Sequence, residues 1–141
     1  MEFEQVVETV DAYIESQHTY FVLENLETLR KNGRLSRVKA LVASALKIKP
    51  VMGSTPEGTI YQLDQARGIN KALVKMVDYV KEGENNSSDK VLAISHCNCP
   101  ERAQMVKEAL LERMQVKDVI ILDTAGVSSM YANDGGIIVV L

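Results

Sequence analysis

The sequence contains no long apolar run, no excess of positive charge and only two cysteines. Its longest apolar run, IIVVL at residues 137–141, is much shorter than the roughly 20 residues of a membrane helix, so we expect no stable membrane insertion. The first residues do not combine a basic segment with an apolar one, so no signal peptide is expected either. The net charge of −3 argues against general nucleic-acid binding, which usually needs a basic domain.

The two cysteines, Cys97 and Cys99, are separated by a single residue. This spacing is poorly suited to a structural disulfide, so a reducing compartment is the simplest expectation. We therefore expect a cytoplasmic protein.

The length of 141 residues fits one domain, which we place over residues 1–141. The spacing of apolar residues and the positions of glycine and proline predict a series of helices and strands. Helices are predicted over 2–17, 24–33, 37–47, 67–81 and 100–115, strands over 19–24, 90–95, 118–122 and 137–141, a hairpin over 49–64, and a loop over 123–136. Strands and helices mostly alternate, but the hairpin requires antiparallel pairing. The predicted fold class is therefore α/β, with a mixed parallel and antiparallel sheet covered by helices.

The sequence HCNC at residues 96–99 is the first candidate for chemistry. His96, Cys97 and Cys99 could bind a soft metal, although zinc sites favour two to four residues between cysteines and need a fourth ligand. A cysteine nucleophile with His96 as its base is a second option, but adjacent residues of a strand point to opposite faces. The plainer interpretation is a set of polar residues at a strand end, where α/β proteins also place ligands. We expect no metal and no catalytic residue here, and keep His96 as a candidate ligand contact.

Two further segments carry candidate binding residues. The predicted loop at 123–136 is rich in small and hydroxyl side chains, which could face an anion, although it matches neither a P-loop nor a dinucleotide fingerprint. The predicted helix at 37–47 is apolar nearly all round, so it is either plain core or the wall of an apolar cavity. Basic residues flank it and are either solvated or a dock for an acidic partner or a phosphate.

Several stretches together resemble one known family. YFVLENLETLRKNGRLS at 20–36 resembles the DegV family signature L-E-x-L-R-K-x-G-R-I-S after a strand, and ALVASALKIKPVM at 40–52 its segment ending in I-K-P. ARGINKAL at 66–73 resembles R-G-x-x-K-A-L, and AISHCNCPERA at 93–103 resembles I-x-H-x-x-x-P-E-x-A. The stretch from 123 to 141 aligns with the family's last loop and strand. The resemblance covers nearly the whole chain.

The resemblance implies a two-domain α/β architecture that binds a long-chain fatty acid and presents its carboxylate to the catalytic subunit of a fatty acid kinase. This chain resembles the C-terminal half, which holds the acyl tail, so a partner N-terminal DegV domain is expected. The expected tail contacts are Leu35, Val38, Leu41, Val42, Ala45 and Leu46. The expected head-group contacts are Tyr131, Ser129 and His96, with Tyr131 standing where the family usually has histidine.

The resemblance implies a non-catalytic binding subunit with no cofactor besides the fatty acid. Two alternatives stay open. One is an interaction module without lipid, which docks an acidic partner through the basic patch of residues 30–49, led by Arg30, Lys31, Arg34 and Arg37. The other is an enzyme that uses the HCNC cysteines. An isolated half with an exposed apolar cleft could also form a homodimer.

Overall fold

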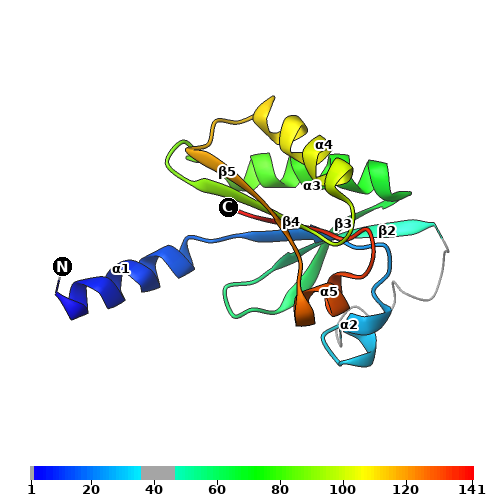
Figure 1. The fold of residues 1–141 in the computed structure, drawn as a ribbon, viewed down its shortest axis with the longest axis horizontal. Helices are drawn as coiled ribbons and strands as arrows, with labels where there is room; N and C mark the ends of the chain where they lie inside the picture. The colour runs from blue at the N-terminus through cyan, green and yellow to red at the C-terminus, as the bar shows by residue number, and fades with distance from the viewer. Residues whose placement is uncertain (1, 36–46) are drawn as a thin grey trace.

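The computed structural model describes residues 2–35 and 47–141, which form one six-stranded sheet with helices on both of its faces (Figure 1). The helices are α1 (Phe3–Glu15), α2 (Glu27–Lys31), α3 (Ile69–Gly83), α4 (Pro100–Leu111) and α5 (Gly126–Ala132). The strands are β1 (Thr19–Val22), β2 (Ile48–Ser54), β3 (Ile60–Arg67), β4 (Val91–His96), β5 (Asp118–Asp123) and β6 (Ile137–Val140).

The sheet is mixed, in the order β3-β2-β1-β6-β4-β5, which confirms the predicted fold class. Among the strands that the structure describes, only β4 and β5 pair in parallel. The other pairings form an antiparallel series in the order β3, β2, β1, β6 and β4. The predicted hairpin is confirmed, because β2 and β3 pair from Ile48 opposite Arg67 to Ser54 opposite Ile60. A connecting α4 crosses from β4 to β5, as a parallel pair requires.

The first face of the sheet is buried beneath α3 and α4. Side chains alternate along each strand, and β4 turns Leu92, Ile94 and His96 toward this face. This face is the side of the sheet that carries the main core. Helix α3 contributes an apolar stripe at helical spacing to that core. The stripe consists of Ala72, Leu73, Met76, Val77 and Val80. This core fixes the sheet on which the opposite face is built.

Among the described residues, α2 and α5 cover the second face in part. Phe21, Met52 and Ile138 lie side by side across β1, β2 and β6 and pack with Leu29 of α2 and Ala132 of α5 in a second cluster. Toward β5 the same face stays open, and Ile120 and Leu122 are 43% and 51% exposed. In residues 2–35 and 47–141, the first face is therefore sealed, and the second is apolar and partly open.

The predicted helix over 2–17 is found as α1, and the predictions for α3, α4 and the strands hold within a few residues at their ends. The predicted loop at 123–136 is wrong in part, because α5 occupies its middle. Most of the predicted helix at 37–47 lies outside the described residues. None of the helices in residues 2–35 and 47–141 is long and apolar enough to cross a membrane.

Candidate functional site

An apolar pocket of about 240 Å³ lies on the second face, between the sheet, α2 and α5. Its lining atoms are almost all carbon. The lining consists of Thr19, Phe21, Leu23, Leu29, Ile60, Ser128, Tyr131, Ala132 and Ile138. Such a cavity is suited to an apolar ligand, because no charged side chain of the described residues lines it.

The floor of the pocket is the pairing of β1 with β6. Phe21 stands opposite Ile138 in this antiparallel ladder, so the two side chains share the open face. One wall is Leu29 of α2, and Ile60, the first residue of β3, lies at another side. The floor is therefore built from strands whose other face is anchored in the main core.

The remaining wall comes from α5, the helix that sequence reasoning missed. Ser128, Tyr131 and Ala132 stand at i, i+3 and i+4 and so share one side of the helix. This spacing is the signal that could have revealed α5, but the segment is short and rich in small residues, so its propensity is weak. The Ser128 hydroxyl closes the first turn, donating to the carbonyl of Ala125 at 2.7 Å and accepting from its N–H at 3.1 Å.

The turn after α5 presses the helix onto the sheet. Gly136 packs against the last turn so closely that a Cβ there would collide with the carbonyl oxygen of Ala132. Asn133 has a φ of +57°, in the left-handed region, and its side-chain oxygen accepts a hydrogen bond from Thr28 Oγ1 at 3.3 Å. The position of Tyr131 in the wall thus depends on this tight turn.

The expected head-group residues do not all meet at the pocket. Tyr131 lines it, whereas the Ser129 hydroxyl donates to Thr124 Oγ1 at 2.9 Å on another side of α5. His96 lies on the first face, 5% exposed, with Nδ1 accepting from the Cys99 N–H at 3.3 Å and Nε2 3.5 Å from Asp123 Oδ1. The structure brings Tyr131 and Ser128 to the pocket, and it holds His96 beneath the other face.

The HCNC cysteines are free and point to different cores. Cys97 packs with the second cluster and Cys99 with the main core; both follow the end of β4, where the chain leaves the strand and turns into α4. Burial raises the pKa of the Cys99 thiol, which makes it a weaker nucleophile at neutral pH. The described part of the chain holds no group of three His, Cys, Asp or Glu side chains placed to bind a metal.

Several expected residues lie outside the described part of the chain: Val38, Leu41, Val42, Ala45, Leu46 and Arg37. Leu35 is 4% exposed and packs in the second cluster, and it is not among the residues that line the pocket. Arg30 and Lys31 lie on exposed α2, where both approach Glu27, Arg30 Nη2 at 2.6 Å and Lys31 Nζ at 3.6 Å. The hydrogen bond from Arg30 lowers the pKa of the Glu27 carboxyl. The structure thus places this part of the basic patch beside the pocket wall formed by Leu29.

A second polar feature, which sequence reasoning missed, joins the strand ends near the pocket. Glu24 is paired with Lys49 at 2.8 Å and with Arg102 at 3.0 Å, and Arg102 also donates to the carbonyl of Gly135. Burial alone would raise the pKa of Glu24, but the two cations outweigh it and hold the pKa below its usual value. The cluster ties β1, β2 and α4 to the turn before β6.

Comparison with known proteins gives consistent matches along the whole chain. A family model described as "Uncharacterised protein, DegV family" matches residues 1–141. A DegV domain-containing protein of Streptococcus pneumoniae strain R6 is 34% identical over 139 residues, covering 98% of this chain and 48% of the relative. The chain therefore spans about half the length of the curated relatives it matches.

Solved structures agree. A DegV family protein from Ruminococcus gnavus, refined with vaccenic acid, is 64% identical with a TM-score of 0.94, covering 100% of this chain and 50% of that one. The fatty acid kinase (Fak) B3 protein of Streptococcus pneumoniae, loaded with linoleic acid, is 32% identical with a TM-score of 0.86, covering 99% of this chain and 49% of that one.

Proposed function

The chain belongs to the DegV family, and we propose that it holds the acyl tail of a long-chain fatty acid in the apolar pocket between α2, α5 and the sheet. The observation that carries this proposal is the carbon lining of that pocket on the open face. The fatty acids bound by the R. gnavus and S. pneumoniae proteins support it, because both share this half of the fold.

The chemistry of the pocket selects the tail over the head group. Each methylene removed from water contributes roughly 0.8 kcal/mol, so a cavity with a carbon lining stabilises an alkyl chain. A carboxylate in the same place would lose its hydration and gain no cation or backbone N–H. The fatty acid therefore enters tail first and keeps its carboxylate at or beyond the mouth.

We place the head group toward α5, where Tyr131 and Ser129 are the proposed contacts. The Tyr131 phenol can donate a hydrogen bond to a carboxylate, and the Ser129 hydroxyl can do so once it leaves Thr124. His96 is not included, because it faces the other side of the sheet. In this proposal, the domain that forms the other half of the relatives' chains supplies further contacts to the carboxylate. In this proposal the chain binds and presents a ligand and catalyses nothing itself.

The kinase that would receive the carboxylate is proposed to dock on the exposed basic patch. Arg30 and Lys31 of α2, and Arg34 just after it, are exposed, and the same helix supplies Leu29 to the pocket wall. A docking surface there would bring an acidic partner close to a ligand held against Leu29. Reversing Arg30 and Lys31 to glutamate should weaken kinase binding and leave fatty-acid content unchanged. Lys71→Glu, at an exposed position of α3, should change neither quantity. Equal losses at both places would remove the patch from the proposal.

The test of lipid binding is mass spectrometry of an organic-solvent extract from the purified protein. Two preparations are compared: this chain alone, and this chain joined to the other half of the R. gnavus relative. In each, Ile60→Trp fills the pocket from its edge. Val74→Trp is the matched control, because Val74 is a similar aliphatic residue, 52% exposed on α3 over the opposite face.

We expect a stoichiometric fatty acid in the joined protein and in its Val74→Trp variant, and a loss of most of it in Ile60→Trp. The melting temperature of each variant shows whether the fold is kept. Fatty acid retained in a folded Ile60→Trp variant would place the tail elsewhere. A joined wild-type protein without fatty acid would refute lipid binding.

A further inference from the structure

Helix α1 carries an apolar stripe that the described part of the chain leaves uncovered. The stripe consists of Phe3, Val6, Val7, Val10, Tyr13 and Ile14, which are 41% to 75% exposed. No residue of α1 is buried, and the helix projects away from the sheet (Figure 1). The rest of its surface is acidic, since residues 2–16 contain five Asp or Glu and no Lys or Arg. A contiguous apolar stripe with a polar border marks an interaction surface.

The sequence of α1 cannot sustain this helix without a partner. A helix of 13 residues is marginal in water even for good helix formers. This one has β-branched residues at Val6, Val7, Thr9 and Val10, which lower helix propensity further. Packing of the stripe against another surface supplies the missing stability.

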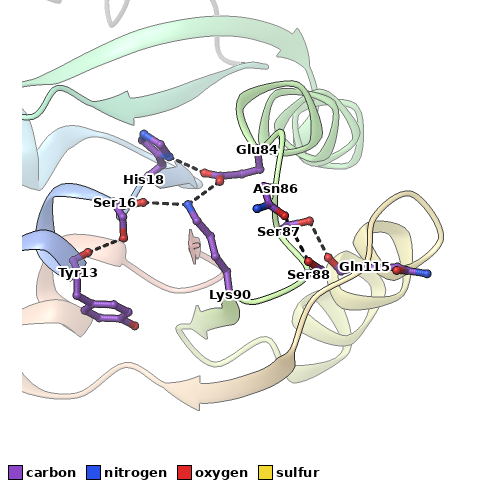
Figure 2. A network of polar contacts seen from close by, with 9 residues as sticks. All are labelled: Tyr13, Ser16, His18, Glu84, Asn86, Ser87, Ser88, Lys90 and Gln115. Atoms are coloured by element: carbon purple, nitrogen blue, oxygen red, sulfur yellow. Dashed lines mark hydrogen bonds and ion pairs between the residues drawn. The ribbon is translucent and has the colours of Figure 1, made fainter. Parts of the chain in front are cut away.

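The base of α1 is held rigidly, which fixes the direction of the stripe. Figure 2 shows Lys90 donating to the carbonyl of Ser16, which ends the helix, at 3.0 Å. Lys90 also pairs with Glu84 at 2.7 Å. Glu84 in turn contacts His18, which lies between the end of α1 and β1, at 2.5 Å. The Glu84 side chain is only 3% exposed. This anchor fixes where α1 leaves the domain, so the stripe faces a set direction when the helix is formed.

Two grooves flank this base and continue the stripe onto the domain. The larger, of about 820 Å³, brings Ile14 of α1 together with Tyr61 of β3. The smaller, of about 420 Å³, brings Tyr13 together with Ile120 and Val140 of the open sheet face. The two grooves also carry polar side chains, but through Tyr13, Ile14 and Tyr61 they place the stripe next to apolar groups of the domain.

The relatives provide a body of the right size to cover it. The R. gnavus structure matches all of this chain, α1 included, and that chain is twice as long. We propose that α1 and the two grooves at its base are the surface on which the other half of the DegV protein packs. The facing patch of that half is apolar with a basic border, because the border of the stripe is acidic. This inference does not depend on what the apolar pocket binds.

The test is amide hydrogen exchange of α1 in this chain joined to the other half of the R. gnavus relative, beside this chain alone. Val10→Glu places a charge in the stripe. Thr9→Glu is the matched control, because it adds the same charge one residue away, outside the stripe. Both residues are outside the core, so the melting temperature of the domain should stay unchanged and report correct folding.

We expect α1 to exchange rapidly in the chain alone and at least about tenfold more slowly in the joined protein. Val10→Glu should remove that protection and Thr9→Glu should keep it. Equal protection in both variants would overturn the proposal, and so would an unprotected α1 in the joined wild-type protein. Protection in the chain alone that rises with its concentration would also overturn it, because a second copy would then be the occupant.

Discussion

Replacing Glu84 by glutamine should destabilise the domain and also change the ionisation of a tyrosine. The carboxylate is 3% exposed and contacts Lys90 and His18, whose side chains are 26% and 50% exposed. Breaking a fully buried pair costs about 3–5 kcal/mol, and partial exposure of both partners reduces this to about 2 kcal/mol. For a domain of this size, that loss lowers the melting temperature by about 6 °C.

The second effect concerns Tyr20, which is 8% exposed. Burial, and after it the negative charge of Glu84, raises the pKa of Tyr20 to about 12. Glu84→Gln removes the charge and leaves the burial, so the phenol should ionise at a lower pH, still above its ordinary value of 10.0.

The assay is a thermal melt together with an ultraviolet titration of tyrosinate, in which Tyr20→Phe identifies the Tyr20 step. Glu82→Gln is the control, because Glu82 lies on the same helix and is exposed. An unchanged melt and an unchanged last tyrosinate step in Glu84→Gln would refute the reasoning. A fall in melting temperature without a shift of Tyr20 would refute the electrostatic part alone.

Three further outcomes are expected from the structure. Because the pKa of Tyr20 is raised in the folded state, its contribution to stability is complete below pH 10 and is lost as the pH rises toward about 12. Urea unfolding should show that the free energy of unfolding falls by up to about 3 kcal/mol over this range, and that Tyr20→Phe lacks this fall. Because the pKa of Glu24 is lowered, its pairing stabilises the fold above pH 4.5, its ordinary pKa, and this stabilisation is lost as the pH falls below that value. In urea titrations, Arg102→Met should make the free energy of unfolding depend less on pH in this acid range. A dependence as steep as that of the wild type would count against the ion cluster. Gly136→Ala should cost about 3 kcal/mol by calorimetry, because its Cβ meets backbone, while Gly53→Ala, whose Cβ meets side-chain atoms of Leu63 and Tyr61, should cost less than half as much. Similar costs would contradict the close packing described for Gly136.

Regular periodicity made most of the sheet and its covering helices predictable. The stripe from Ala72 to Val80 has clear helical spacing, and the turn between β2 and β3 carries proline and glycine. The order of the strands depends on contacts between distant residues, such as Thr19 with Val140, which no local pattern encodes. The sequence therefore indicated the fold class without the arrangement.

The site was less predictable than the fold. Helix α5 has weak propensity and exists because Tyr131 and Ala132 pack on the sheet, so tertiary contacts decide it. The sequence places His96 at a strand end without showing which face of the sheet it takes. The alternation along β4 places it on the first face, away from the pocket. Tyr131 was named for its hydroxyl, and in the structure it lines the apolar pocket.

The position of β6 has a consequence for how the chain folds. Strands β3, β2 and β1 form one half of the sheet and β4 and β5 the other, and only β6 is hydrogen-bonded to both. Its residues, 137–140, follow those of β1 to β5 along the chain, so they are synthesised after both halves. During translation the two halves can each begin to form, but the ladder that unites them cannot close until this segment has left the ribosome. Folding of this unit is therefore completed late, and the unpaired edges of β1 and β4 stay open to other strands until then.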